Sequence, residues 1–348
     1  MHKDSTAARS VVASLVLLGL AMPLPAIAQS QTNYVCRGFE GPQADFSGTP
    51  MMTAKDGVVW IVKQNENRLI RVDKNHKVTA VVPGDGANGP LEGMTLGPDG
   101  SIWYSKILGH RMGRIPANGG KGVEYELPYE NASPGALAAD SKGRIWYTDQ
   151  TNNKVGYMTS DGNVVTFDAP TPDNSITAPQ SITIAADNSV WVTSMSLNAI
   201  LRVDPESGAF TRYDIATPDA QPTLLTRGPQ GALWFLMPAV HKIGRITTSG
   251  QITEFETGSE LVESLAAGPD GAIWYSSRVE VGRLNPSSGR VQKFACAGGG
   301  GMTVGPDAHL WIQSLIGQDI YEVKRRNEGS AARVVGAASA RAAVGQKP

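Results

Sequence analysis

The chain has 348 residues, of which 41% are hydrophobic and 18% charged, and 31 Lys and Arg residues nearly balance 32 Asp and Glu residues. This composition excludes a disordered chain and allows one large domain or two ordinary ones. A net charge of -1 without a long basic run argues against nucleic acid as the main partner. The 39 Gly and 22 Pro residues suit strands and turns better than helical bundles.

The N-terminus, residues 1–28, has the order of a secretory signal peptide. A charged start is followed by an apolar run from Val11 to Met22, which is shorter than the roughly 20 residues of a spanning helix. The small residues Ala26-Ile27-Ala28 then predict cleavage after position 28. Pro23 and Pro25 directly after the run disfavour the alternative, a retained membrane anchor. The mature chain is therefore expected in the periplasm or outside the cell, without a membrane span.

Seven tryptophans recur at spacings of 43, 43, 45, 43, 40 and 37 residues: Trp60, Trp103, Trp146, Trp191, Trp234, Trp274 and Trp311. Each ends a turn-and-strand phrase such as Pro98-Asp99-Gly100-Ser101-Ile102-Trp103, in which Asp-Gly suits a tight turn. An aromatic strand closes each unit, so four strands fit into about 43 residues. That is the size of a propeller blade, and the repeats predict an all-β, seven-bladed β-propeller of four-stranded blades.

A recurring arginine follows the tryptophan in five repeats. In four repeats it stands eleven residues after the Trp, as Arg71, Arg114, Arg202 and Arg245. In the sixth repeat it is Arg283, nine residues after Trp274. A residue that recurs in nearly every blade indicates packing rather than chemistry. We therefore expect the Trp to pack between blades and the Arg to reach an adjacent blade.

The two ends of the repeat region predict how the ring closes. Asn33-Tyr34-Val35-Cys36 is typical of an outer strand, whereas the last repeat ends after Tyr321-Glu322-Val323 without one. The N-terminal strand should complete the last blade and remove an exposed sheet edge. The propeller is expected over residues 29–326, followed by a disordered tail of Ala, Gly, Ser and Arg at residues 327–348.

The two cysteines, Cys36 and Cys296, could form one disulfide in an oxidising compartment. Each stands two residues after an aromatic residue in neighbouring outer strands. Equivalent positions there would lie beyond the roughly 7 Å that a disulfide allows between Cα atoms. A bridge would need a local distortion, and the sequence leaves the question open.

Several phrases resemble those of the streptogramin B lyases, also called virginiamycin B lyases. They are Gly-Pro-Asp-Gly-x-Ile-Trp-Tyr at residues 97–104 and 268–275, Lys242-Ile243-Gly244-Arg245-Ile246-Thr247, and Tyr213-Asp214-Ile215-Ala216-Thr217-Pro218. The resemblance covers all seven repeats. It implies a magnesium-assisted elimination that opens a cyclic depsipeptide at its ester bond, a reaction that needs a base and a Lewis acid.

The resemblance also implies that the residue eleven positions before each Trp lies at the mouth of the central channel. These mouth positions are Thr49, Glu92, Gly135, Gln180, Thr223, Glu263 and Gly300, and none is histidine. The family's substrate-contacting His falls on Glu263 and its base on Gly300. Its two metal-binding Glu residues fall on Gly298 and on Ser314-Leu315. All four positions are changed, so the family's mechanism is not expected here.

Other residues at the mouth could support a different reaction. Glu92 and Glu263, three blades apart, could bind a divalent cation or act as acid and base, and they are the candidate catalytic and metal residues. Alternatively, they are solvated charges offset by two lysines. Residues three past a Trp are expected near the same face, so the predicted ligand-binding set is Thr49, Lys63, Glu92, Lys106, Asp149, Gln180, Thr223 and Glu263.

The histidines add no catalytic motif. His110 and His241 lie in equivalent loops, seven residues after Trp103 and Trp234, and are interpreted as surface residues near the mouth. His309 precedes Trp311 in a turn on the opposite face and is interpreted as structural.

Three functional hypotheses remain. The first is a monomeric binding propeller without a required cofactor, which takes a small molecule, a peptide or an envelope protein at the channel face. The second is a carbon-oxygen lyase or lactone-opening enzyme that uses Glu92 and Glu263 with magnesium or another divalent cation. The third is a structural module of an envelope complex, contacted through Leu108–Arg111 and Leu236–His241.

Overall fold

The computed structural model describes residues 34–43, 45, 49–84, 89–117, 121–171, 177–317 and 319–326. The predicted signal peptide at residues 1–28 and the predicted tail at residues 327–348 lie outside the described residues. Among the described residues, no helix has the length and hydrophobicity needed to cross a membrane.

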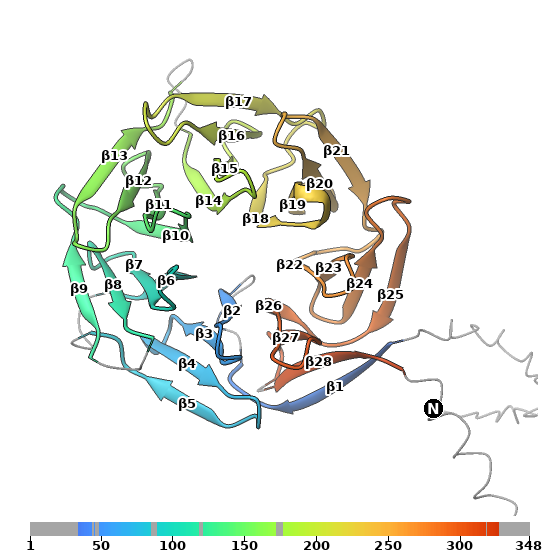
Figure 1. Cartoon of the computed structure of the whole chain (residues 1–348). Coiled ribbons are helices and arrows are strands. Elements are labelled where there is room, and N and C mark those ends of the chain that lie inside the picture. Colours follow the sequence, from blue (N-terminus) through green and yellow to red (C-terminus); the bar gives the residue numbers. More distant parts are fainter. Residues whose placement is uncertain are drawn as a thin grey trace, which may run out of the picture. The chain divides into compact units, whose positions relative to one another are not determined.

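Seven antiparallel sheets of four strands follow one another around a ring (Figure 1), which confirms the predicted all-β propeller. In blades one to three the strands are β2 (Met51–Thr53), β3 (Val59–Lys63), β4 (Arg68–Val72), β5 (Val78–Val81); β6 (Leu91–Leu96), β7 (Ile102–Lys106), β8 (Arg111–Ile115), β9 (Val123–Glu126); β10 (Pro134–Ala139), β11 (Ile145–Asp149), β12 (Lys154–Met158) and β13 (Val164–Asp168). In blades four to six they are β14 (Pro179–Ile184), β15 (Val190–Ser194), β16 (Ala199–Val203), β17 (Phe210–Asp214); β18 (Thr223–Arg227), β19 (Leu233–Met237), β20 (Lys242–Ile246), β21 (Ile252–Glu256); β22 (Ser264–Ala267), β23 (Ile273–Ser276), β24 (Glu280–Leu284) and β25 (Val291–Ala295).

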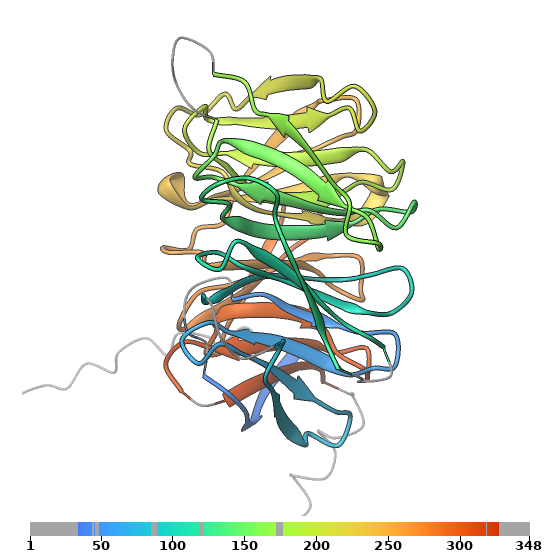
Figure 2. The same cartoon turned by 90° about the vertical axis from the view of Figure 1, so that its left-hand side faces the viewer.

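Blade seven combines the two ends of the repeat region. It contains β26 (Gly299–Val304), β27 (Leu310–Ser314), β28 (Asp319–Arg325) and, as its outer strand, β1 (Tyr34–Glu40). Two short 3-10 helices, η2 (Pro229–Gly231) and η3 (Pro238–Val240), lie in the loops of blade five. Figure 2 shows the ring from its edge, with the hairpin turns projecting toward its two faces.

The recurring tryptophans form the packing between blades, as the sequence predicts. None is more than 7% exposed. Trp60 of blade one packs with Ile102 and Tyr104 of blade two, and Trp191 of blade four packs with Phe235 of blade five. Burial of such a side chain contributes about 1.5–3 kcal/mol, so the repeated tryptophan stabilises each seam of the ring.

The recurring arginine has a partner in its own blade that the sequence analysis did not predict. Register places it directly across from the Trp, as in the pair of Trp274 and Arg283. Its guanidinium therefore reaches the turn of its own blade, where Arg283 Nε donates to Asp270 Oδ2 at 2.6 Å and Trp274 Nε1 donates to Asp270 Oδ1 at 2.9 Å. Arg114 pairs with Asp99 in the same way. Arg283 also reaches the adjacent blade as expected, because its guanidinium lies 5.9 Å from the ring centroid of Tyr34 in β1 of blade seven. For Arg114 the pairing is within its own blade, where the antiparallel register already brings a partner close.

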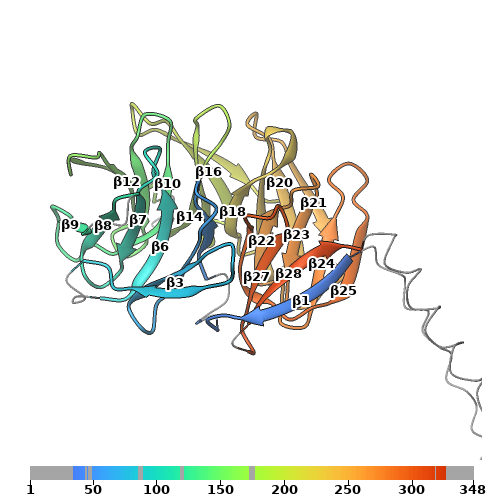
Figure 3. The same ribbon diagram turned by 60° about the horizontal axis from the view of Figure 1, so that its bottom comes forward.

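Ring closure follows the prediction. β1 pairs antiparallel with β28, with Tyr34 opposite Arg325, Cys36 opposite Val323 and Glu40 opposite Asp319. Figure 3 shows β1 lying along β28 at the edge of blade seven. The N-terminal strand thus supplies the outer strand that the last repeat lacks.

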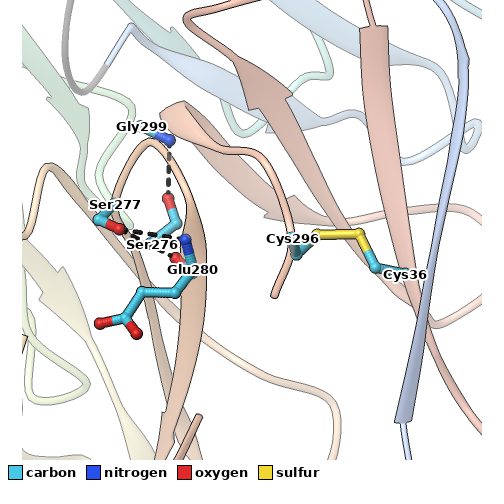
Figure 4. The surroundings of a disulfide bond; sticks show 6 residues. All are labelled: Cys36, Ser276, Ser277, Glu280, Cys296 and Gly299. Carbon is cyan, nitrogen blue, oxygen red and sulfur yellow. Dashed lines mark hydrogen bonds between the residues drawn. A yellow bond between two sulfur atoms is a disulfide. The ribbon is translucent and has the colours of Figure 1, made fainter. Parts of the chain in front are cut away.

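A disulfide joins Cys36 and Cys296, whose Cα atoms are 5.9 Å apart (Figure 4). Cys296 lies one residue beyond the end of β25, where the chain leaves the outer edge of blade six for β26. The two cysteines are therefore not at equivalent outer-strand positions. This answers the question that the sequence left open, because the crossover segment runs past β1 at disulfide distance.

The disulfide closes a loop across 260 positions and attaches the closing strand to the neighbouring blade. We expect the double variant Cys36→Ser, Cys296→Ser to lose about 2–5 kcal/mol of unfolding free energy, because the unfolded chain is no longer constrained. Urea unfolding followed by tryptophan fluorescence measures this loss. A reductant added to the parent protein should cause the same loss, and unchanged midpoints in both cases would contradict a stabilising bridge.

Candidate ligand site at the channel mouth

The innermost strands enclose two cavities along the channel. One, of about 630 Å³, is lined by five of the seven mouth positions: Glu92, Gly135, Gln180, Thr223 and Glu263. The other, of about 510 Å³, is lined by the innermost strands of all seven blades and includes the buried Thr49. Pro50 and Leu224 line both. The mouth cavity has the size of a small-molecule site.

β-Bulges contain four of the seven mouth positions, Glu92, Gly135, Gln180 and Gly300. The register of β6 shifts between Leu91 and Met94, which leaves Glu92 and Gly93 unpaired with β7. Equivalent shifts occur in β10 and β14, and the β14 shift contains Gln180. Bulges bend a strand and redirect a side chain, and they are common beside functional sites. Five of the seven predicted positions line the mouth cavity, and the bulges themselves have no clear sequence signal.

A hydroxyl two residues after the Trp holds neighbouring bulges together. Ser105 Oγ accepts the N–H of Gly93 at 2.7 Å and donates to the carbonyl oxygen of Gly135 in the next blade at 2.7 Å. A Cβ atom on Gly93 would lie 2.2 Å from that same oxygen, so only glycine fits there. Thr148 makes the equivalent pair of contacts and also lines the mouth cavity.

The sequence analysis missed these hydroxyls, although the printed chain carries the signal. A Ser or Thr stands two residues after the Trp in four repeats: Ser105, Thr148, Thr193 and Ser276. The bonds of Ser105 and Thr148 join the bulges of neighbouring blades at the mouth.

Two carboxylates supply the charge of the mouth cavity. Of the described residues that line it, only Glu92 and Glu263 are charged. Gln64 Nε2 donates to Glu92 Oε2, while Glu263 Oε1 lies 3.2 Å from Nε of Arg278, whose side chain is 58% exposed. Burial raises the pKa of Glu92, and this outweighs the opposite effect of the Gln64 hydrogen bond. The two carboxyl groups can accept hydrogen bonds from N–H donors of a ligand.

Three of the predicted ligand-binding residues point elsewhere. Lys106 is fully buried, with its Nζ 2.6 Å from Oε1 of Glu124, and Lys63 pairs with Asp45. Asp149 accepts hydrogen bonds from the hydroxyl of Tyr129 and from backbone N–H groups. None of the three is among the described residues that line the two cavities. The expectation that these residues lie at the mouth is therefore corrected. Side chains along a strand alternate between the two faces of its sheet. A residue three past the Trp faces a neighbouring blade rather than the channel.

The loop histidines also stay outside the mouth cavity. His110 Nδ1 contacts the carbonyl oxygen of Ala132, and His241 ends η3 in the left-handed conformation. Neither is among the described residues of the cavity lining. Both histidines therefore make contacts within or beside their own turns.

Exposed apolar side chains lie at and around the mouth. Leu261 lines the cavity, is 62% exposed and has a positive φ of 54°. Leu108, Val279 and Ile316 are exposed in loops on the same face. A leucine in the left-handed region is strained, and such residues cluster at ligand clamps. Apolar side chains beside two carboxylates suit an amphipathic ligand that carries N–H donors.

Comparisons with known proteins agree on one family. The sequence profile of the virginiamycin B lyase family matches residues 23–175 and 172–344. A virginiamycin B lyase from Nocardia farcinica (strain IFM 10152) is 28% identical over 236 residues, which cover 66% of this chain and 78% of the relative. A solved streptogramin B lyase structure has a TM-score of 0.74 at 26% identity and covers 84% of this chain and 97% of its own. A catalytically inactive virginiamycin B lyase from Staphylococcus aureus, solved with quinupristin, has a TM-score of 0.73 at 28% identity, with coverages of 84% and 99%.

The raised pKa of Glu92 predicts a pH-dependent effect of its removal. Because the folded state favours the protonated form, this group stabilises the fold fully below its unfolded pKa. That stability is lost as pH rises through the higher folded pKa. Glu92→Gln should therefore raise the melting temperature at pH 7, by up to about 3 °C, and the difference should shrink toward about pH 4.

Differential scanning calorimetry across this pH range measures the effect. Glu260→Gln is the control, since it removes an exposed glutamate charge from the same face. A Glu92→Gln difference that grows as the pH falls would contradict the assignment.

Proposed function

This chain belongs to the virginiamycin B lyase family, and from that premise we propose that it is a binding propeller without the family's ring-opening reaction. Its mouth cavity would hold a small amphipathic molecule whose N–H donors meet Glu92 and Glu263. The proposal places the mature chain, cleaved after Ala28, in the periplasm or outside the cell as a monomer. The Cys36–Cys296 disulfide supports an oxidising compartment.

The observation that carries the proposal is the composition of the cavity lining. None of the described residues that line it is a histidine, the residue type to which the resemblance assigns substrate contact and proton abstraction. Gly300 and Gly298, where the resemblance places the base and a metal ligand, have no side chain to supply either. A base for the elimination would have to come from elsewhere in the cavity.

The glycine segment packs closely against a mouth carboxylate. A Cβ atom on Gly299 would lie 2.5 Å from Oε2 of Glu263 and 2.6 Å from Leu315. Gly299 also has a positive φ of 92°, which favours glycine. This part of the mouth is built without side chains, and Glu263 takes the space beside it. The arrangement supports binding at Glu263 more readily than the family's base and metal set.

The ligand class follows from the walls of the cavity. Leu224, Leu261 and Val262 provide apolar surface, Gln180 and Thr223 provide neutral hydrogen-bonding groups, and the two glutamates attract donors. Peptide-like molecules combine these features. Quinupristin, present in the structure of the Staphylococcus aureus relative, is therefore a suitable first probe.

Calorimetric titration with quinupristin, with and without magnesium, tests the proposal together with mass spectrometry of the recovered compound. We expect saturable binding at one site and an unchanged mass. Leu261→Asp should weaken binding about tenfold or more, because it removes apolar contact and adds charge repulsion beside two carboxylates. Val165→Asp, an exposed valine on the outer strand β13, is the matched control. Ring opening would contradict the proposal, and a lack of saturable binding would contradict the ligand class.

A second candidate function rests on the two carboxylates lining one cavity. Magnesium binds to one or two carboxylates and keeps several waters, so Glu92 and Glu263 could hold it for a lyase or lactone-opening reaction. Thermal-shift titrations with magnesium, calcium and manganese separate the two candidates. The binding proposal predicts no shift that depends on the glutamates. A shift of RT ln(1 + [L]/Kd) form that both Glu92→Gln and Glu263→Gln abolish would favour the enzyme.

A further inference from the structure

Blade seven reverses the charge at a repeated structural position. Five blades place an arginine opposite the Trp, whereas here Trp311 is opposite Glu322. The turn of blade seven keeps its aspartate, Asp307, four residues before the Trp. The side chain of Glu322 is only 5% exposed. Two carboxylates therefore meet where other blades form an ion pair, and this arrangement is unfavourable unless a cation accompanies it.

Imidazoles from two blades surround this pair. His309 Nδ1 lies 2.6 Å from Asp307 Oδ2, and His76 Nε2, in the β4–β5 turn of blade one, lies 3.1 Å from Glu322 Oε1. The ring of His76 stacks on Phe39 with centroids 3.8 Å apart, which fixes its orientation. Of the described residues, Asp307, His309 and Glu322 form a group whose ligand atoms all lie within 4.8 Å of one another.

We propose that Asp307, His309 and Glu322 bind a divalent transition-metal ion of the zinc type, with His76 orienting Glu322. One imidazole nitrogen and two carboxylate oxygens are ligands that zinc accepts, and a water can complete a tetrahedron. Ligand atoms about 2.0–2.2 Å from such an ion are separated by roughly 3.3 Å, so small side-chain rotations from the present distances suffice. His309, interpreted from sequence as structural, becomes a metal ligand in this proposal.

The effect of removing Lys324 would distinguish a metal site from an ion-pair network. Its Nζ pairs with Glu322 Oε2 and lies 3.9 Å from Asp307 Oδ2, so it supplies positive charge beside both carboxylates. The side chain is 32% exposed, and its long stem can carry the ammonium into solvent. A bound metal ion would displace this contact. Removal of the lysine should therefore strengthen metal binding, whereas in an ion-pair network it would only weaken the cluster.

The site lies at the seam between blades seven and one, on the face opposite the mouth. Asp307 and His309 belong to the turn that follows β26, and β26 runs away from the mouth. The contact of His76 with Glu322 ties blade one to the same cluster. Metal binding would therefore stabilise ring closure, and it is independent of the ligand proposed for the mouth cavity.

Titration of the untagged protein with zinc, by calorimetry and thermal shift, tests the proposal. We expect one zinc per chain, a raised melting temperature, and a visible absorption spectrum typical of low-coordinate cobalt when cobalt replaces zinc. His309→Ala and Asp307→Asn should each weaken zinc binding about tenfold or more, whereas Lys324→Met should strengthen it several-fold. His241→Ala, a turn histidine outside the cluster, is the control for removal of an imidazole and should leave zinc affinity unchanged.

Three results would overturn the site: no zinc binding by the parent protein, equal affinity in His309→Ala, or weaker binding in Lys324→Met. Lys324→Met keeps the test decisive if either ligand variant fails to fold, because it removes only a partly exposed side chain. Failure of the mouth proposal would show in the quinupristin titration alone, so the two outcomes remain distinguishable.

Discussion

Ring closure is the constraint on which the rest of this structure depends. Each blade buries both faces against its neighbours, so a missing outer strand would expose a sheet edge. The pairing of β1 with β28 removes that edge, and the Cys36–Cys296 disulfide attaches the closing strand to the crossover from blade six. Because the innermost strands must then meet around one channel, their contacts set its width. The hydroxyls of Ser105 and Thr148 bridge N–H and carbonyl groups at the bulges of neighbouring blades. In the closed ring, these hydrogen bonds hold the innermost strands together at the mouth.

Within each blade, the residues that maintain the fold occupy different positions from the residues that line the mouth. Positions that repeat, such as Trp103 with Arg114 and Asp99, have partners within the blade or in the next one. Several positions that vary, among them Glu92 and Gln180, lie in the bulges, where the strand leaves its ladder and no repeated partner constrains the side chain. Glu92 and Gln180 can therefore differ from their counterparts without loss of the fold. Ligand chemistry can change at the mouth while each Trp remains buried.

Much of the fold could be predicted from the spacing of the tryptophans, because four short strands and their turns occupy a nearly constant length. The closing role of the N-terminal strand followed from the missing outer strand of the last repeat. The orientation of side chains was harder to predict. Lys63, Lys106 and Asp149 follow their Trp at a constant spacing, but strand alternation turns them into the seams between blades. The distance between Cys36 and Cys296 depends on the path of a crossover, and a linear sequence does not specify that path.

Two blades depart from the Trp–Arg pairing, and their comparison shows when a departure carries functional meaning. In blade three, Tyr157 is opposite Trp146 in place of the arginine, but Arg144, the residue just before β11, compensates. Its guanidinium lies 4.9 Å from the ring of Tyr157 and 2.6 Å from Oδ2 of Asp140. The ion pair is rebuilt, so the departure is structural. In blade seven Lys324 also supplies positive charge beside Glu322, but two imidazoles join the cluster, His76 at Glu322 and His309 at Asp307. An imidazole is also a neutral ligand for a metal ion. A departure that rebuilds only the ion pair is structural, whereas one that also gathers ligating atoms of a different kind supports the separate site proposed above.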